Sequence, residues 1–148
     1  MNSLIELNAM LRVYNANFLN IHWNAATENF DDIHKGITTD YYELCDKYID
    51  STAEMIARFA VNAPNYMEVA KIAEEKQFLV VDSSVLYDRA TTINLSDKML
   101  GDICKLIVVC LDEIKETYNS GIKSDLEAML SEFDLQYRYI NKRRIATE

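Results

Sequence analysis

The sequence predicts an all-α protein: a four-helix bundle with one long crossover connection between its second and third helices. Only three Gly and one Pro occur in 148 residues, which is too few for the turns of a many-stranded sheet. Four stretches repeat apolar residues three and four positions apart, the spacing of helices packed almost parallel in a bundle. The connections between these stretches are short, long and short, in that order.

The first two helices are expected in the N-terminal half of the chain. The apolar positions of the first are Leu4, Leu7, Leu11, Tyr14, Phe18 and Ile21. Ser3-x-x-Glu6 predicts its start, because these side chains can satisfy two free backbone N–H groups. The apolar positions of the second are Tyr41, Cys45, Tyr48, Thr52, Met55 and Phe59. We expect this helix to begin further upstream, with Asn29 as its cap.

The third and fourth helices form a second hairpin. The apolar positions of the third are Leu100, Cys104, Ile107, Leu111, Ile114 and Tyr118, and those of the fourth are Leu126, Leu130, Phe133, Tyr137 and Ile140. A turn at Asn119-Ser120-Gly121 is expected to end the third helix. Ser124-x-x-Glu127 predicts the start of the fourth.

The long connection runs from about residue 61 to residue 95. Residues 66–77 predict a short helix within it, and the apolar run 78–81 must be covered by other parts of the chain. One long crossover between two helical hairpins is the ferritin-like connectivity. We therefore expect residues 1–148 to form a single domain of this kind.

Charge and cysteine usage narrow the range of functions. The net charge of −9 argues against a general nucleic-acid surface, and the only basic run is Lys142-Arg143-Arg144. Three cysteines without CxxC spacing indicate reduced thiols. The sequence begins without a signal-peptide pattern and has no apolar run near 18 residues, so we expect a cytoplasmic protein that is not in the membrane.

The two histidines and a row of carboxylates are the candidate metal ligands. His22 ends the first helix, and His34 follows twelve residues later. Asp50 and Glu54 lie on the second helix, where they point away from the core of their own subunit. This row is either a solvated acidic face or half of a metal site that a second subunit completes. A di-iron site within one chain needs two Glu-x-x-His motifs, and the sequence does not supply them.

The motif His22-Trp23-Asn24, followed by His34 and then by Asp50-x-x-x-Glu54, resembles the Dps family, the mini-ferritins of starved bacteria. The resemblance implies a hollow homo-dodecamer that protects against oxidative stress by oxidising Fe(II) with peroxide or oxygen and storing the ferric mineral. It further implies non-haem iron bound between subunits, by His22 and His34 of one and Asp50 and Glu54 of the other. Trp23 would lie beside this centre. DNA binding, a second activity in parts of the family, is not expected here.

Two departures from the family pattern bear on the activity. Thr38 stands where the family usually has an Asp, four residues after its second His. One extra residue also separates His34 from Asp50, and it would turn the helix face by about 100° unless a local unwinding near Gly36 absorbs it. These departures leave the enzymatic activity open. The alternatives are a ferritin-like assembly protein without ferroxidase activity and a helical interaction module.

Overall fold

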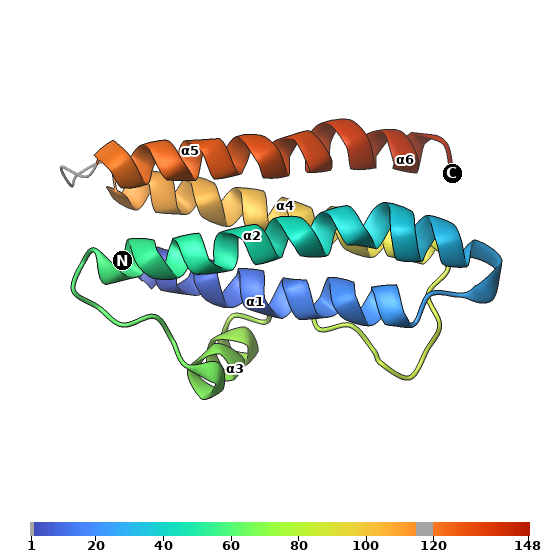
Figure 1. The fold of residues 1–148 in the computed structure, drawn as a ribbon, viewed down its shortest axis with the longest axis horizontal. Coiled ribbons are helices and arrows are strands. Elements are labelled where there is room, and N and C mark those ends of the chain that lie inside the picture. The colour runs from blue at the N-terminus through green and yellow to red at the C-terminus, as the bar shows by residue number, and fades with distance from the viewer. Residues whose placement is uncertain (1, 115–119) are drawn as a thin grey trace.

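The computed structural model describes residues 2–114 and 120–148, and four long helices form the bundle in Figure 1. They are α1 (Asn2–Trp23), α2 (Thr38–Ala57), α4 (Arg89–Ile114) and α5 (Ser120–Asp134). Helices α1 and α2 run antiparallel, as do α4 and α5, whereas α2 and α4 run in the same direction. The connection between α2 and α4 must therefore return along the bundle. This arrangement confirms the predicted helical hairpins and the long crossover.

The crossover carries the predicted short helix, α3 (Tyr66–Glu75). Asn65 caps α3 and Glu68 closes a capping box with it. The apolar run that follows is only partly covered, because Phe78 is buried while Val80 is 72% exposed. The crossover ends at Arg89, where α4 begins earlier than the periodic pattern predicts.

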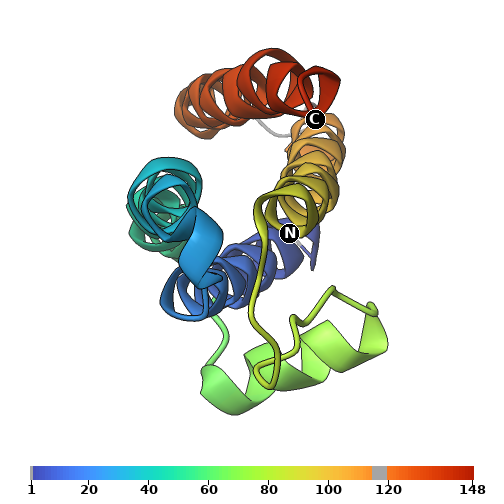
Figure 2. The ribbon, with the colours of Figure 1, turned by 90° about the vertical axis from the view of Figure 1, so that its right-hand side faces the viewer.

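Hydrogen bonds to backbone groups of the crossover fix it against α1 and the loop that follows α1. The side-chain amide of Asn17 donates to the carbonyl oxygen of Leu79 at 2.7 Å. Further along, the backbone of Tyr87 donates to Asn24 at 2.8 Å and accepts from Ala26 at 2.7 Å, forming an isolated parallel bridge. These bonds hold the end of the crossover beside the loop that follows α1. Figure 2 shows the crossover and its helix α3 beside α1, on the side of the bundle opposite α5.

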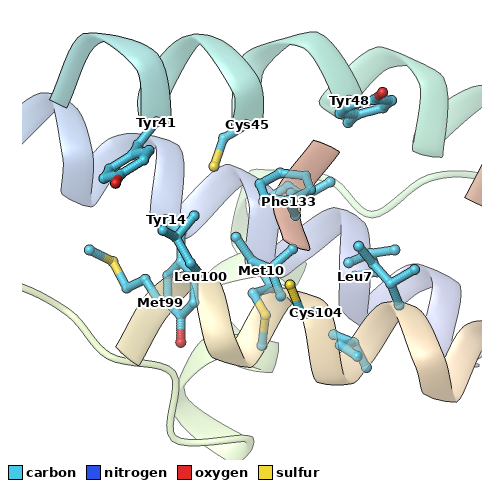
Figure 3. Close-up of a cluster of buried hydrophobic side chains, with 14 of the residues drawn as sticks. Leu7, Met10, Tyr14, Tyr41, Cys45, Tyr48, Met99, Leu100, Cys104 and Phe133 are labelled. Carbon is cyan, nitrogen blue, oxygen red and sulfur yellow. The ribbon is translucent and has the colours of Figure 1, made fainter. Parts of the chain in front are cut away.

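The core lies between the four helices and is built mainly from the predicted apolar positions, several of which Figure 3 shows. The six predicted positions of α1 are all at most 1% exposed. Burial of each such leucine or phenylalanine contributes about 1.5–3 kcal/mol to folding. Cys45 and Cys104 are free and buried in this core, as small apolar residues. Within residues 2–114 and 120–148, no helix combines the length and apolarity needed to cross a bilayer.

A π-helix, η2 (Asp32–Ile37), precedes α2 and contains Gly36. Its widened turn lets the backbone N–H of Thr38 reach the carbonyl oxygen of Ile33, five residues back. This finding confirms the predicted local unwinding near Gly36. The remaining short elements are η1 (Thr27–Asn29), a second π-helix η3 (Leu135–Asn141), and α6 (Lys142–Ala146).

Both capping boxes predicted for the long helices are wrong. Ser3 lies within α1, where its hydroxyl donates to the carboxylate of Glu113 on α4 and so serves packing between helices. Helix α5 begins at Ser120, so Ser124 lies inside this helix and cannot cap it. Gly121 is helical too, and the predicted turn there is wrong at this residue. The predicted positions at Tyr118 and Asn119 lie outside the described residues.

Deletion of Gly36 should leave the bundle folded, because the π-helix can lose one residue and become a regular α-helical turn. Deletion of the exposed Lys47 in the middle of α2 is the control, since it rotates the core-facing residues of one half of α2 by about 100°. We expect the Gly36 deletion to keep native circular dichroism and cooperative thermal unfolding, and the Lys47 deletion to lose both. An equal loss of native circular dichroism and cooperative unfolding in the two deletion variants would contradict this account of η2.

Candidate metal centre

The two histidines form a stacked pair at one end of the bundle. His22 lies in the last turn of α1 and His34 in η2. Their ring centroids are 3.6 Å apart and their planes are inclined by 16°. Phe30 stacks on His34 with a centroid distance of 4.6 Å, and Tyr42 approaches His22 edge-on at 5.2 Å. The rings therefore hold one another in place between α1, η2 and α2.

Hydrogen bonds set the tautomer of both imidazoles. His34 Nδ1 is 2.9 Å from the carbonyl oxygen of His22, which can only accept, so this nitrogen carries the proton. Thr38 donates its hydroxyl to the carbonyl oxygen of Ile33 at 2.6 Å. Its oxygen must then accept from His22 Nδ1, which is 3.0 Å away. In both rings Nε2 keeps its lone pair, the form in which histidine binds metal ions.

Burial lowers the pKa of His22, and repulsion from a charged His34 lowers it further. Both effects disfavour the imidazolium form, although a hydrogen bond with the backbone involving His34 opposes them. His22 is therefore neutral at pH 7. Neutral imidazole is the state that a divalent cation requires of its ligand.

Large aromatic side chains are exposed next to the histidine pair. Both histidines are half-buried, while Trp23 is 67% exposed and Phe30 is 40% exposed. Aromatic residues of this size are enriched at protein interfaces, where one face of the ring becomes covered. The surface around the pair thus carries two large exposed aromatic rings.

Asp50 and Glu54 do not meet the histidines within one chain. Both carboxylates are exposed on α2, on the side turned away from the core, as the sequence predicts. Sixteen residues of helix separate His34 from Asp50, which corresponds to about 24 Å. Across the described ranges 2–114 and 120–148, no three His, Cys, Asp or Glu side chains cluster closely enough to hold a metal ion. Within one chain, therefore, the histidine pair and the two carboxylates do not form one site.

The structure gives Thr38 a role that the sequence does not predict. It is fully buried, and its hydroxyl joins η2 to the ring of His22. Its position is set by η2, in which its backbone N–H and its hydroxyl both donate to the carbonyl oxygen of Ile33. The extra residue and the Thr were both visible in the sequence, but only the folded backbone shows that they act at the same point.

The basic run near the C-terminus is engaged with the protein itself. Lys142 Nζ lies 2.8 Å from Asp97, and Arg144 donates to the hydroxyl of Tyr41 at 2.5 Å. Arg143 stacks over the ring of Tyr139, with 4.3 Å between the guanidinium carbon and the ring centroid. These cations hold α6 against α4, α2 and η3.

The bundle is similar to two solved structures over nearly its whole length. Dps from Staphylococcus aureus aligns with a TM-score of 0.81 and 16% identity, over 96% of this chain and 91% of that one. CAIP from Helicobacter cinaedi aligns with a TM-score of 0.84 and 15% identity, over 97% and 96%. The sequence matches no protein-family model and no curated protein. At these identities the likeness shows a shared fold: the chain has the ferritin-like bundle of Dps.

In the metal-free protein, the pKa of His22 should lie below the usual value of about 6.5. The stabilisation from a neutral His22 is then complete above pH 6.5 and is lost as the pH falls through this value toward the lowered pKa. NMR titration of 13C-labelled histidine measures the pKa directly. The variant His34→Gln should raise it by removing the neighbouring charge. A wild-type pKa of 6.5 or above would contradict the effect of burial.

Proposed function

We propose that this chain assembles into a homo-oligomeric cage that oxidises Fe(II) with peroxide or oxygen and retains the ferric product inside. The observation that carries this proposal is the histidine pair, which combines two free Nε2 lone pairs with a rim of exposed aromatic rings. The likeness of the bundle to that of Dps supports it, and the pair lies where α1 ends and η2 leads into α2.

A second subunit supplies the missing ligands in this proposal. His22 and His34 of one subunit face Asp50 and Glu54 of its partner across a two-fold axis. Because a two-fold interface pairs the same patch on both subunits, each interface contains two equivalent sites. Each site then has two neutral imidazoles and two carboxylates, a ligand set that suits iron.

The stacking of the imidazoles favours two iron ions at each site. A metal ion bound to imidazole lies close to the plane of the ring. Two planes inclined by 16°, with ring centroids 3.6 Å apart, do not intersect near the rings, so the pair does not share one ion without reorienting. Paired metal ions in proteins are typically about 3.5–4 Å apart, which matches the separation of the rings.

Two Fe(II) ions match the electron count of the reaction. Oxidation of both releases two electrons, which, with two protons, reduce one hydrogen peroxide to two water molecules. The carboxylates of Asp50 and Glu54 favour Fe(III) over Fe(II) and so assist the oxidation. The net charge of −9 per chain attracts cations to the assembly. The three cysteines are free and buried, as expected of a protein that acts in a reducing cytoplasm.

The second candidate is a cage-forming protein that has lost the oxidation step. Thr38 favours it, because a hydroxyl committed to Ile33 and His22 adds no carboxylate to the site. Such a protein would assemble but would leave Fe(II) oxidation at the rate of the protein-free solution. The two candidates predict the same particle and different kinetics.

Replacement of Asp50 and Glu54 together by Ala should reduce peroxide-driven Fe(II) oxidation to the protein-free rate. Both side chains are exposed, so the variant should keep the thermal stability and particle size of the wild type. Stopped-flow absorbance of the ferric product gives the rate. A double variant that oxidises iron as fast as the wild type would refute the assignment of these ligands.

The matched control removes two other exposed carboxylates, Asp46 on α2 and Glu74 on α3. Asp46→Ala with Glu74→Ala changes the net charge by the same amount as the first pair. It should leave the rate of oxidation within about twofold of the wild type. An equal loss in both double variants would indicate general electrostatic attraction instead of ligation.

The purified protein should be a multi-subunit particle far heavier than the 17.1 kDa chain. Exposed Trp23 and Phe30 account for this, because solvent would otherwise contact two large aromatic rings. Size exclusion with light scattering measures the mass, and Phe30→Asp should shift it toward smaller species. A monomeric wild type would favour the interaction module over both cage proposals.

A further inference from the structure

We infer that Thr38 is a positioning residue that fixes His22 with Nε2 toward the metal through an orienting hydrogen bond. This inference deepens the proposed function and rests on it for the metal. It gives one explanation for two features of this region: the extra residue before α2 and the hydroxyl group of Thr38.

The direction of each hydrogen bond carries the argument. Thr38 has one hydroxyl proton, and the carbonyl oxygen of Ile33, 2.6 Å away, is an acceptor only. The proton is therefore committed to Ile33. The remaining partner, His22 Nδ1 at 3.0 Å, must be the donor. The chain of bonds from His22 through Thr38 to Ile33 has one consistent direction.

The π-helix makes this arrangement possible. In a regular α-helix the carbonyl oxygen of Ile33 would accept from Ile37, four residues on. In η2 it accepts from the backbone N–H of Thr38 and also from the Thr38 hydroxyl. Thr38 is thereby held by two bonds to one carbonyl group and is completely buried. Its hydroxyl oxygen has little freedom to move from the His22 ring.

The Nδ1 hydrogen bond of His22 can be removed by a side-chain substitution, whereas that of His34 cannot. His34 Nδ1 donates to a backbone carbonyl group, which no side-chain substitution removes. The Nδ1 partner of His22 is a side chain. Loss of its hydroxyl leaves the Nδ1 proton without an acceptor, and the proton can move to Nε2, where it blocks the lone pair. Hydrogen-bond partners of metal-binding histidines typically change metal affinity 10- to 100-fold when they are removed.

The neighbouring residue provides a matched control. Thr39 donates its hydroxyl to the carbonyl oxygen of His34 at 2.8 Å, again five residues back. Thr38→Val and Thr39→Val remove the same group from adjacent residues, and only the first removes the contact with an imidazole. Thr38→Ser keeps the hydroxyl and tests rescue. Val has nearly the shape of Thr, and in the first variant the backbone bond to Ile33 remains, so the fold should survive.

The first readout is the tautomer of His22 in the metal-free assembly, measured by 15N NMR of labelled histidine. The wild type, Thr38→Ser and Thr39→Val should carry the proton on Nδ1, whereas Thr38→Val should shift His22 toward the Nε2–H form. The second readout is Co(II) affinity by calorimetry. It should fall about 10- to 100-fold in Thr38→Val alone and return to within a few-fold of the wild type in Thr38→Ser.

An unchanged tautomer in Thr38→Val would overturn the inference, as would an equal loss of Co(II) affinity in Thr39→Val. The proposed function fails in a different way: the wild type would bind no Co(II). In that event the NMR measurement alone decides whether Thr38 orients His22, and an Nδ1–H tautomer lost only in Thr38→Val would support that role. The two failures are therefore distinguishable.

Discussion

The hydrogen bond from the backbone N–H of Thr38 to the carbonyl oxygen of Ile33 spans five residues, and the geometry around the histidines depends on it. This bond widens one turn of the second helix and accommodates one residue without rotating the rest of α2. The core-facing residues of α2 stay in register with α1, and Thr38 comes to lie beneath His22. A regular α-helical turn with the same sequence would rotate either the core-facing residues of α2 away from α1 or Thr38 away from His22.

The histidine pair is held from several sides, and this explains why a small surface cluster can be ordered. Stacking between His22 and His34 is continued by Phe30, and backbone and hydroxyl groups fix both Nδ1 protons. The groups that remain open are the two Nε2 lone pairs and the exposed indole of Trp23. Among residues 2–114 and 120–148, no third His, Cys, Asp or Glu lies close enough to complete a metal site with this pair, which agrees with the proposed site between subunits.

Fold and chemistry make different demands on this sequence. The bundle needs apolar side chains of about the right size on one face of each helix, a requirement that many sequences satisfy. This is why 15–16% identity accompanies TM-scores of 0.81–0.84. Metal binding needs particular atoms in particular directions, and one hydroxyl in place of a carboxylate changes the site. The inferred role of Thr38 is a way in which the chain orients a ligand without adding charge.

The sequence by itself determined the helices, their apolar faces and the long crossover. These features follow from periodicity and chain length, which are properties of neighbouring residues. It misplaced several helix starts: Ser3 bonds to Glu113 across the bundle, Ser124 lies inside α5, and α4 begins already at Arg89. Only the tertiary structure decided that Thr38 meets His22, since that contact joins residues sixteen apart through the geometry of a π-helix.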